Sequence, residues 1–162
     1  MEAYSEPVTR KFHIVLLQIG GMLQILRYFE SPLNVILMRF GLLRSKFCSY
    51  SIKVRDRTFN MLARPRAQVL SDLNMIRSVI VEQEYARILP LLPDRPLRVL
   101  DIGSNIGSFA VWISKERQVT EIRCFEPDHV SRRLCAFNLE ENSCEGGLFF
   151  KRQSEVRTGS SV

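Results

Sequence analysis

The sequence has few cysteines, few histidines and no long apolar run, and each shortage excludes a class of protein. Its four cysteines include no Cys-x-x-Cys pair and are accompanied by only two histidines, so we expect no zinc site. Cys124 and Cys135 fall within apolar patterns, where free cysteine behaves as a small hydrophobic residue. With no disulfide framework indicated, the sequence predicts a reducing, cytoplasmic environment.

The uncharged run over residues 12–26 is too short to predict a membrane-spanning helix. It has 15 residues and includes polar side chains and a glycine pair, whereas a spanning helix requires about 20 apolar residues. Acidic residues precede it and no small-residue cleavage site follows it, which argues against a signal peptide. We therefore expect a buried or interfacial helix over residues 11–29. Peripheral membrane contact stays open because Lys11 and Arg27 flank the run.

Basic charge is scattered along the chain. The 23 Lys and Arg residues exceed the 17 Asp and Glu residues, which gives a net charge of +6 at pH 7. A nucleic-acid-binding surface usually gathers its charge in a cluster or stripe, and pairs such as Arg132–Arg133 are short. We therefore expect no nucleic-acid partner, and interpret the charge as a solvated surface or an attraction for an acidic substrate.

Hydrophobic periodicity divides the chain into an N-terminal helical and hairpin region, residues 1–95, and an α/β region, residues 96–162. In the first region the pattern predicts helices over 11–29, from Pro32 to Gly41 and over 71–92, with a hairpin of strands 50–55 and 58–64. In the second it predicts strands over 97–100, 121–125 and 148–152, a helix over 106–117, and a helix capped by Asp128. This order predicts an α/β fold, a partial Rossmann-like parallel sheet with helices.

A ligand site is expected where the first strand of the α/β region meets its helix, because ligands bind beyond the carboxyl ends of parallel strands. The stretch "RVLDIGSNIGSFAVWI", residues 98–113, places Asp101 ahead of Gly103 and Gly107 there. Glycine lets the backbone turn tightly and lets a ligand approach closely. The spacing does not match Gly-x-Gly-x-x-Gly, since Asn105 replaces the middle glycine. Asp101 would repel a pyrophosphate and attract an ammonium group.

A second acid, Glu126, ends the next predicted strand in "CFEPD". Its carboxylate faces the same crevice and has acceptor oxygens for both hydroxyls of a ribose. The crevice therefore offers an acid for an amine, bare backbone for close contact and an acid for a ribose. S-adenosylmethionine has this set of groups.

The two motifs together resemble the FkbM family of class I S-adenosylmethionine-dependent methyltransferases. Members of that family tend to show Asp-x-Gly-x-Asn-x-Gly and then Phe-Glu-Pro at the second strand. "DLNMIRSVIVEQEYARI" is also similar to the segment that such proteins carry before the first strand. The resemblance covers residues 70–142, and the pair of motifs is more specific than either one alone.

The resemblance implies that S-adenosylmethionine is the cofactor and that its methyl group goes to a hydroxyl of a small molecule or sugar. It places a loop around the methionine part of the cofactor and an acid on the ribose, with these residues: Asp101, Gly103, Asn105, Gly107 and Glu126. Asp128 would lie near the adenine or simply cap its helix. No catalytic residue is predicted, and His129 is interpreted as a surface residue. Phe109 and Trp112 are expected in the core. Tyr85 could border the pocket, but an amphipathic helix needs such a residue in any case, so it is assigned to the core as well.

The sequence also departs from the family. The family fold continues through further strands, and its acid-rich Asp-x-Glu-Gly-x-Glu element has no match here. We therefore expect an N-terminal portion of a methyltransferase domain. Two alternatives stay open: a non-catalytic remnant of a methyltransferase, and an NAD-binding oxidoreductase fragment.

Overall fold

The computed structural model describes residues 23–24, 26–39, 42, 46–64, 69–144 and 147–148. Most of the helix expected over 11–29 and of the strand expected over 148–152 lies outside these residues. The elements are α2 (Pro32–Arg39), β1 (Cys48–Val54), β2 (Arg57–Ala63), α3 (Val69–Ile76), the π-helical turn η1 (Arg77–Val81), the 3₁₀ segment η2 (Ala86–Leu91), β3 (Leu97–Ile102), α4 (Ser108–Glu116), β4 (Val119–Phe125), α5 (His129–Glu141) and β5 (Gly147–Leu148). No helix within the described part of the chain is both long and apolar enough to cross a membrane.

Strands β1 and β2 form the predicted antiparallel hairpin. Tyr50 pairs with Met61 and Ile52 with Phe59, and all four side chains are buried. Alternate residues of each strand therefore face the core, as their period of two predicts. The chain reverses through Arg55, whose φ of 56° lies in the left-handed region.

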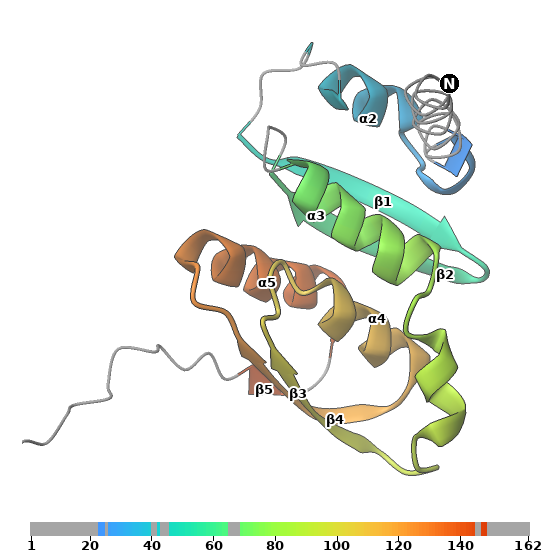
Figure 1. Ribbon diagram of the computed structural model, residues 1–162, viewed down its shortest axis with the longest axis vertical. Coiled ribbons are helices and arrows are strands. Elements are labelled where there is room, and N and C mark those ends of the chain that lie inside the picture. The colour runs from blue at the N-terminus through green and yellow to red at the C-terminus, as the bar shows by residue number, and fades with distance from the viewer. Residues whose placement is uncertain are drawn as a thin grey trace, which may run out of the picture.

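Strands β3, β4 and β5 form a parallel sheet in that order. Helix α4 connects β3 to β4 and packs against both, and α5 follows β4. The predicted α/β fold with a parallel sheet is thus confirmed. Figure 1 shows α4 and α5 between this sheet and the hairpin, and β2 contacts both helices. Buried side chains from the hairpin, α3, α4, the sheet and α5 form one hydrophobic cluster.

The far face of the sheet is exposed. Leu100 and Ile102 of β3 are 59% and 78% exposed. Arg98 and Arg123 pair with Glu121 on the same sheet, with N–O distances of 2.5 Å. Strand β3 also runs to Ile102, two residues beyond the expected end, so Asp101 is a strand residue.

Helix α5 covers the free edge of β2 with two asparagine side chains. The Asn138 amide accepts from the Leu62 N–H (2.6 Å) and donates to the Leu62 carbonyl (3.1 Å). Asn142 makes the same pair of bonds with Asn60, at 3.0 and 2.6 Å. Asn138 also donates to the Ile106 carbonyl at 2.7 Å. The amides thus replace a neighbouring strand, and Asn138 ties the hairpin to the loop before α4.

Replacing Asn138 by alanine should lower the free energy of unfolding by about 1–3 kcal/mol, because it leaves buried backbone groups of Leu62 and Ile106 without partners. Urea denaturation of the two proteins measures the difference. Glu140→Ala, at an exposed position of the same helix, is the control and should change stability by less than about 0.5 kcal/mol. Equal effects of the two substitutions would contradict the role of Asn138.

The single helix expected over 71–92 is wrong. Helix α3 ends at Ile76, a π-helical turn follows, Gln83 has a φ of 52°, and η2 contains Pro90. The branched residues Val79, Ile80 and Val81 are all buried, and such a run disfavours a regular α-helix. Proline cannot donate the hydrogen bond that an α-helix needs. Helix α4 also begins at Ser108, two residues later than expected, because Gly107 is left-handed.

Candidate functional site

A cavity of about 240 Å³ opens at the carboxyl end of β3. One wall is the chain from Asp101 to Asn105, which leaves β3 and turns toward α4. The remaining lining residues come from α3, η1, the segment before η2 and the start of α4, and are Met75, Val79, Tyr85, Ser108 and Phe109. The site expected at the end of the first α/β strand therefore coincides with a cavity of this structure.

Asp101 brings a buried acid to the cavity. Its Oδ2 is buried and has no hydrogen-bond partner among the described residues. Burial, with a smaller contribution from the charge of Glu126, raises the pKa of Asp101 to about 6. A buried carboxylate without a partner is unfavourable. A cationic ligand group at this position would compensate its charge.

Glu126 lies just beyond β4 and connects two loops; it does not line the cavity, although the sequence predicted that it faces the same crevice as Asp101. Its Oε2 accepts from the Asn105 N–H at 2.8 Å, and its Oε1 accepts from the Asp128 N–H at 2.9 Å. Each carboxylate oxygen can accept two hydrogen bonds, so both oxygens keep one acceptor position. The contact with Oε2 holds the backbone of Asn105 at a φ of 48°. That value lies in the left-handed region, which asparagine adopts more often than most other residues.

The two glycines of the loop have different surroundings. Both are left-handed, with φ of 79° at Gly103 and 84° at Gly107. A Cβ atom on Gly103 would meet nothing within 4 Å, whereas a Cβ on Gly107 would lie 2.9 Å from the Cys135 Sγ. Gly103 thus leaves open space beside the cavity, and Gly107 allows α5 to pack against the loop.

An aromatic pair borders the cavity. The rings of Tyr85 and Phe109 meet edge to face, with centroids 5.0 Å apart, and Trp112 lies behind them, 5.9 Å from Phe109. Trp112 is buried as expected, and Phe109 is partly buried against the core but also lines the cavity. Tyr85 is 38% exposed and lines the cavity, so its assignment to the core is wrong. The helix break before η2 places it there. Pro90 lies within η2, after this break, so it does not signal the break from the sequence.

Ser108 is a cavity residue that the sequence reasoning missed. It is the first residue of α4 and is buried, and its Oγ has no hydrogen-bond partner among the described residues. A serine at the start of a helix after a glycine loop is a weak signal by itself. The structure adds that the residue lines the cavity, with its Oγ covered by the surrounding atoms.

Asp128 caps α5, as predicted. Its Oδ2 accepts from the Ser131 N–H at 2.7 Å. Hydrogen bonds from the backbone and the side chain of Ser131, together with the charge of Arg64, lower the pKa of Asp128 below its ordinary value. The neighbouring His129 is exposed and does not line the cavity. No group of three or more His, Cys, Asp or Glu side chains in the described part of the chain could hold a metal ion.

No family model and no curated protein matches the chain. Solved structures with a similar arrangement include the Pyrococcus abyssi tRNA (uracil-54, C5)-methyltransferase in complex with S-adenosyl-L-homocysteine. That structure is 17% identical, with a TM-score of 0.41 over 72% of this chain and 26% of that one. M. jannaschii TYW2 in complex with AdoMet is 12% identical, with a TM-score of 0.40 over 68% of this chain and 45% of that one. The chain thus spans less than half the length of either protein.

Proposed function

We propose that this chain carries the cofactor-binding part of an S-adenosylmethionine-dependent methyltransferase. The observation that carries the proposal is the pair of carboxylates, Asp101 and Glu126, at the ends of adjacent parallel strands. Between them lies a glycine loop that lines a cavity. An amino acid joined to a nucleoside matches this arrangement, since it presents an ammonium group at one end and two ribose hydroxyls at the other.

The methionine end fits the described cavity. The carboxylate of Asp101, which lines the cavity, would pair with the ammonium group, and the start of α4 would bind the ligand carboxylate. Gly103 leaves open space in which the methionine part of the ligand would lie. Gly107 would act indirectly, since it shapes the loop through its packing on Cys135.

The nucleoside end fits the neighbouring edge. Glu126 keeps an acceptor position on each oxygen after binding the Asn105 and Asp128 amides. Those amides fix the position of the carboxylate, whose remaining acceptor positions would take two ribose hydroxyls. The adenine would then lie toward Asp128, whose side chain is partly exposed.

When bound, S-adenosylmethionine supplies an activated methyl group for transfer in line to an acceptor. The residues of this chain would bind and orient the cofactor, and Tyr85 and Phe109 would exclude water from one side of the cavity. The pair of sequence motifs supports an acceptor of the FkbM type, a hydroxyl of a small molecule or sugar. No residue is assigned as the base that would remove the proton of the acceptor hydroxyl.

Substitution of Glu126 tests the ribose contact. We expect Glu126→Ala to weaken binding of S-adenosylhomocysteine by about 1–3 kcal/mol, the usual loss when hydroxyl hydrogen bonds go unmade. Isothermal titration calorimetry measures the dissociation constant. Glu121→Ala is the matched control, since Glu121 lies on β4 but pairs with surface arginines. A dissociation constant unchanged in Glu126→Ala would contradict the ribose role.

Ligand binding and methyl transfer, measured on the same purified protein, distinguish the proposed function from its two alternatives, an oxidoreductase fragment and a non-catalytic remnant. An oxidoreductase fragment would be stabilised by NADH, whereas the proposed site would be stabilised by S-adenosylhomocysteine, because only a ligand of the folded state raises the melting temperature. Asp101 disfavours NADH, since its buried charge would repel a pyrophosphate. Binding of S-adenosylmethionine without methyl transfer to any hydroxyl acceptor would favour the non-catalytic remnant.

A further inference from the structure

Arg64, the residue after β2, is fixed by a buried acid outside the cavity. Its backbone N–H and its Nε donate to the Asp72 Oδ2 at 3.1 and 2.8 Å, and its Nη2 donates to Oδ1 at 2.7 Å. Asp72 lies in α3 and is fully buried. A guanidinium bound through two of its nitrogens to one carboxylate has a single orientation. Asp72 thus determines where the other edge of the Arg64 group points.

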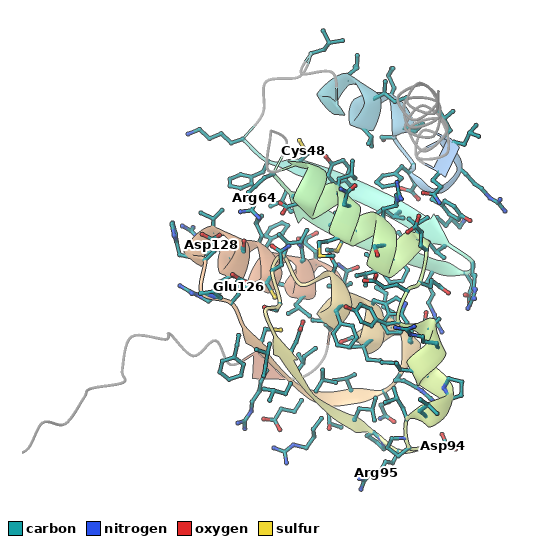
Figure 2. All side chains as sticks on the ribbon, in the orientation of Figure 1. Cys48, Arg64, Asp94, Arg95, Glu126 and Asp128 are labelled. Carbon is teal, nitrogen blue, oxygen red and sulfur yellow. The ribbon has the colours of Figure 1, made fainter. Side chains whose placement is uncertain are left out.

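That other edge reaches both loops of the candidate site. Arg64 Nη2 lies 3.5 Å from the Asn105 Oδ1, on the loop after β3, and Nη1 lies 3.6 Å from the Asp128 Oδ2, on the loop after β4. Glu126 joins the same two loops through their backbone amides. Figure 2 shows Arg64, Glu126 and Asp128 on the same side of the molecule. Arg64 and Glu126 therefore hold one pair of loops from two directions.

We infer that Arg64 is a positioning residue for the nucleoside half of the ligand, acting through Asn105 and Asp128; this inference rests on the proposed function. Arg64 does not line the cavity. Its charge lies beside the acids that would face the nucleoside, and its side-chain contact supports the left-handed backbone of Asn105. A lysine at this position would keep the charge but lose the planar fork that contacts Asp72 and both loops together.

The decisive experiment compares Arg64→Lys with the unmodified chain by calorimetry, using S-adenosylhomocysteine and 5′-methylthioadenosine, which lacks the amino-acid end. We expect the affinity for both ligands to fall by about tenfold or more, as for the loss of a hydrogen bond to a charged group. Arg57→Lys is the matched control, because Arg57 lies at the other end of β2 and also pairs with an acid, Glu116, outside the cavity. It should leave both affinities unchanged.

A second comparison separates positioning from folding. If Arg64→Lys does not unfold cooperatively, Asn105→Gly replaces it, since glycine keeps the left-handed backbone and removes the cavity-lining side chain that contacts Arg64. If both variants fold, their effects on affinity should be less than additive in the double variant, because they remove the same contact. Unchanged binding of both ligands by the variant that folds, or additive effects, would overturn the inference. Failure of the unmodified chain to bind S-adenosylhomocysteine would instead reject the proposed function.

Discussion

Asp101→Asn should make the unliganded protein more stable and, at the same time, remove most of its affinity for S-adenosylhomocysteine. The stability gain follows from the raised pKa of Asp101, about 6 in the folded chain against about 3.9 for an unperturbed aspartate. In the folded state the carboxyl holds its proton more tightly than in the unfolded state. Stability from this group is therefore present at low pH, falls as the pH rises from about 4 to about 6, and stays low above that.

The expected gain at pH 7 is about 1–3 kcal/mol, because asparagine has the same shape and no charge to bury. Urea denaturation of the two proteins at pH 4 and pH 7 measures it. The variant should be more stable than the unmodified chain at pH 7, and the two should converge toward pH 4. A variant that is less stable at pH 7 would show that Asp101 has a partner that compensates its charge in the folded state.

The affinity of Asp101→Asn for S-adenosylhomocysteine should fall, whereas its stability rises. Loss of a charge that pairs with the ligand ammonium in a buried site should cost about 2–5 kcal/mol of affinity for S-adenosylhomocysteine. The affinity for 5′-methylthioadenosine, which has no ammonium group, should change little and serves as the control. In the unmodified chain, S-adenosylhomocysteine should bind about tenfold more weakly for each pH unit below about 6, as Asp101 becomes protonated. Equal losses for both ligands would contradict a contact between Asp101 and the amino group.

The expected opposition between stability and binding is typical of a site residue, since a charge that is unfavourable in the free protein can pair with the ligand in the complex. The sequence already indicated Asp101 and Glu126, because the carboxyl ends of adjacent parallel strands meet at one edge of a sheet. The alternation of apolar residues likewise predicted the hairpin. These features depend on local patterns, and the structure reproduces the hairpin and the order β3, α4, β4, α5 that those patterns indicate, but it interrupts the helix expected over 71–92 after Ile76.

Contacts between distant segments could not be predicted in this way. Arg64 and Asp72 are eight positions apart, but their relation to Asn105 depends on how α3 and the hairpin pack on the α/β unit. Asn138 is a polar residue within a helix, and its pattern alone suggests an exposed position. It is buried because the free edge of β2 needs hydrogen-bond partners.

The two loop glycines show what sequence spacing alone leaves undecided. Motif matching treats Gly103 and Gly107 alike, and both have a positive φ. Their neighbours differ, since Gly103 faces open space and Gly107 faces Cys135 of α5. Alanine at each position therefore separates a requirement of ligand binding from a requirement of packing.

Gly107→Ala is expected to lower the free energy of unfolding by about 2–5 kcal/mol, a large part of the stability of a typical domain. The left-handed conformation costs about 1–2 kcal/mol for alanine. Overpacking adds about 1–3 kcal/mol, because the new Cβ would lie 2.9 Å from the Cys135 Sγ and 3.2 Å from the Cys135 Cα. Urea denaturation measures the loss. Cys135→Ala in the same chain should restore part of it, since the contact with Sγ would be lost while those with Cα, at 3.2 Å, and Cβ, at 3.4 Å, would persist.

Gly103→Ala provides the contrast. It carries the same conformational cost of about 1–2 kcal/mol without a steric contact, because nothing lies within 4 Å of the added Cβ. Its methyl group would project into the space where the ligand lies in the proposed complex. Its larger effect should therefore be on the affinity for S-adenosylhomocysteine, measured by calorimetry on the folded variant. Normal affinity in Gly103→Ala would show that the ligand does not approach the backbone there, and would remove the loop from the proposed site.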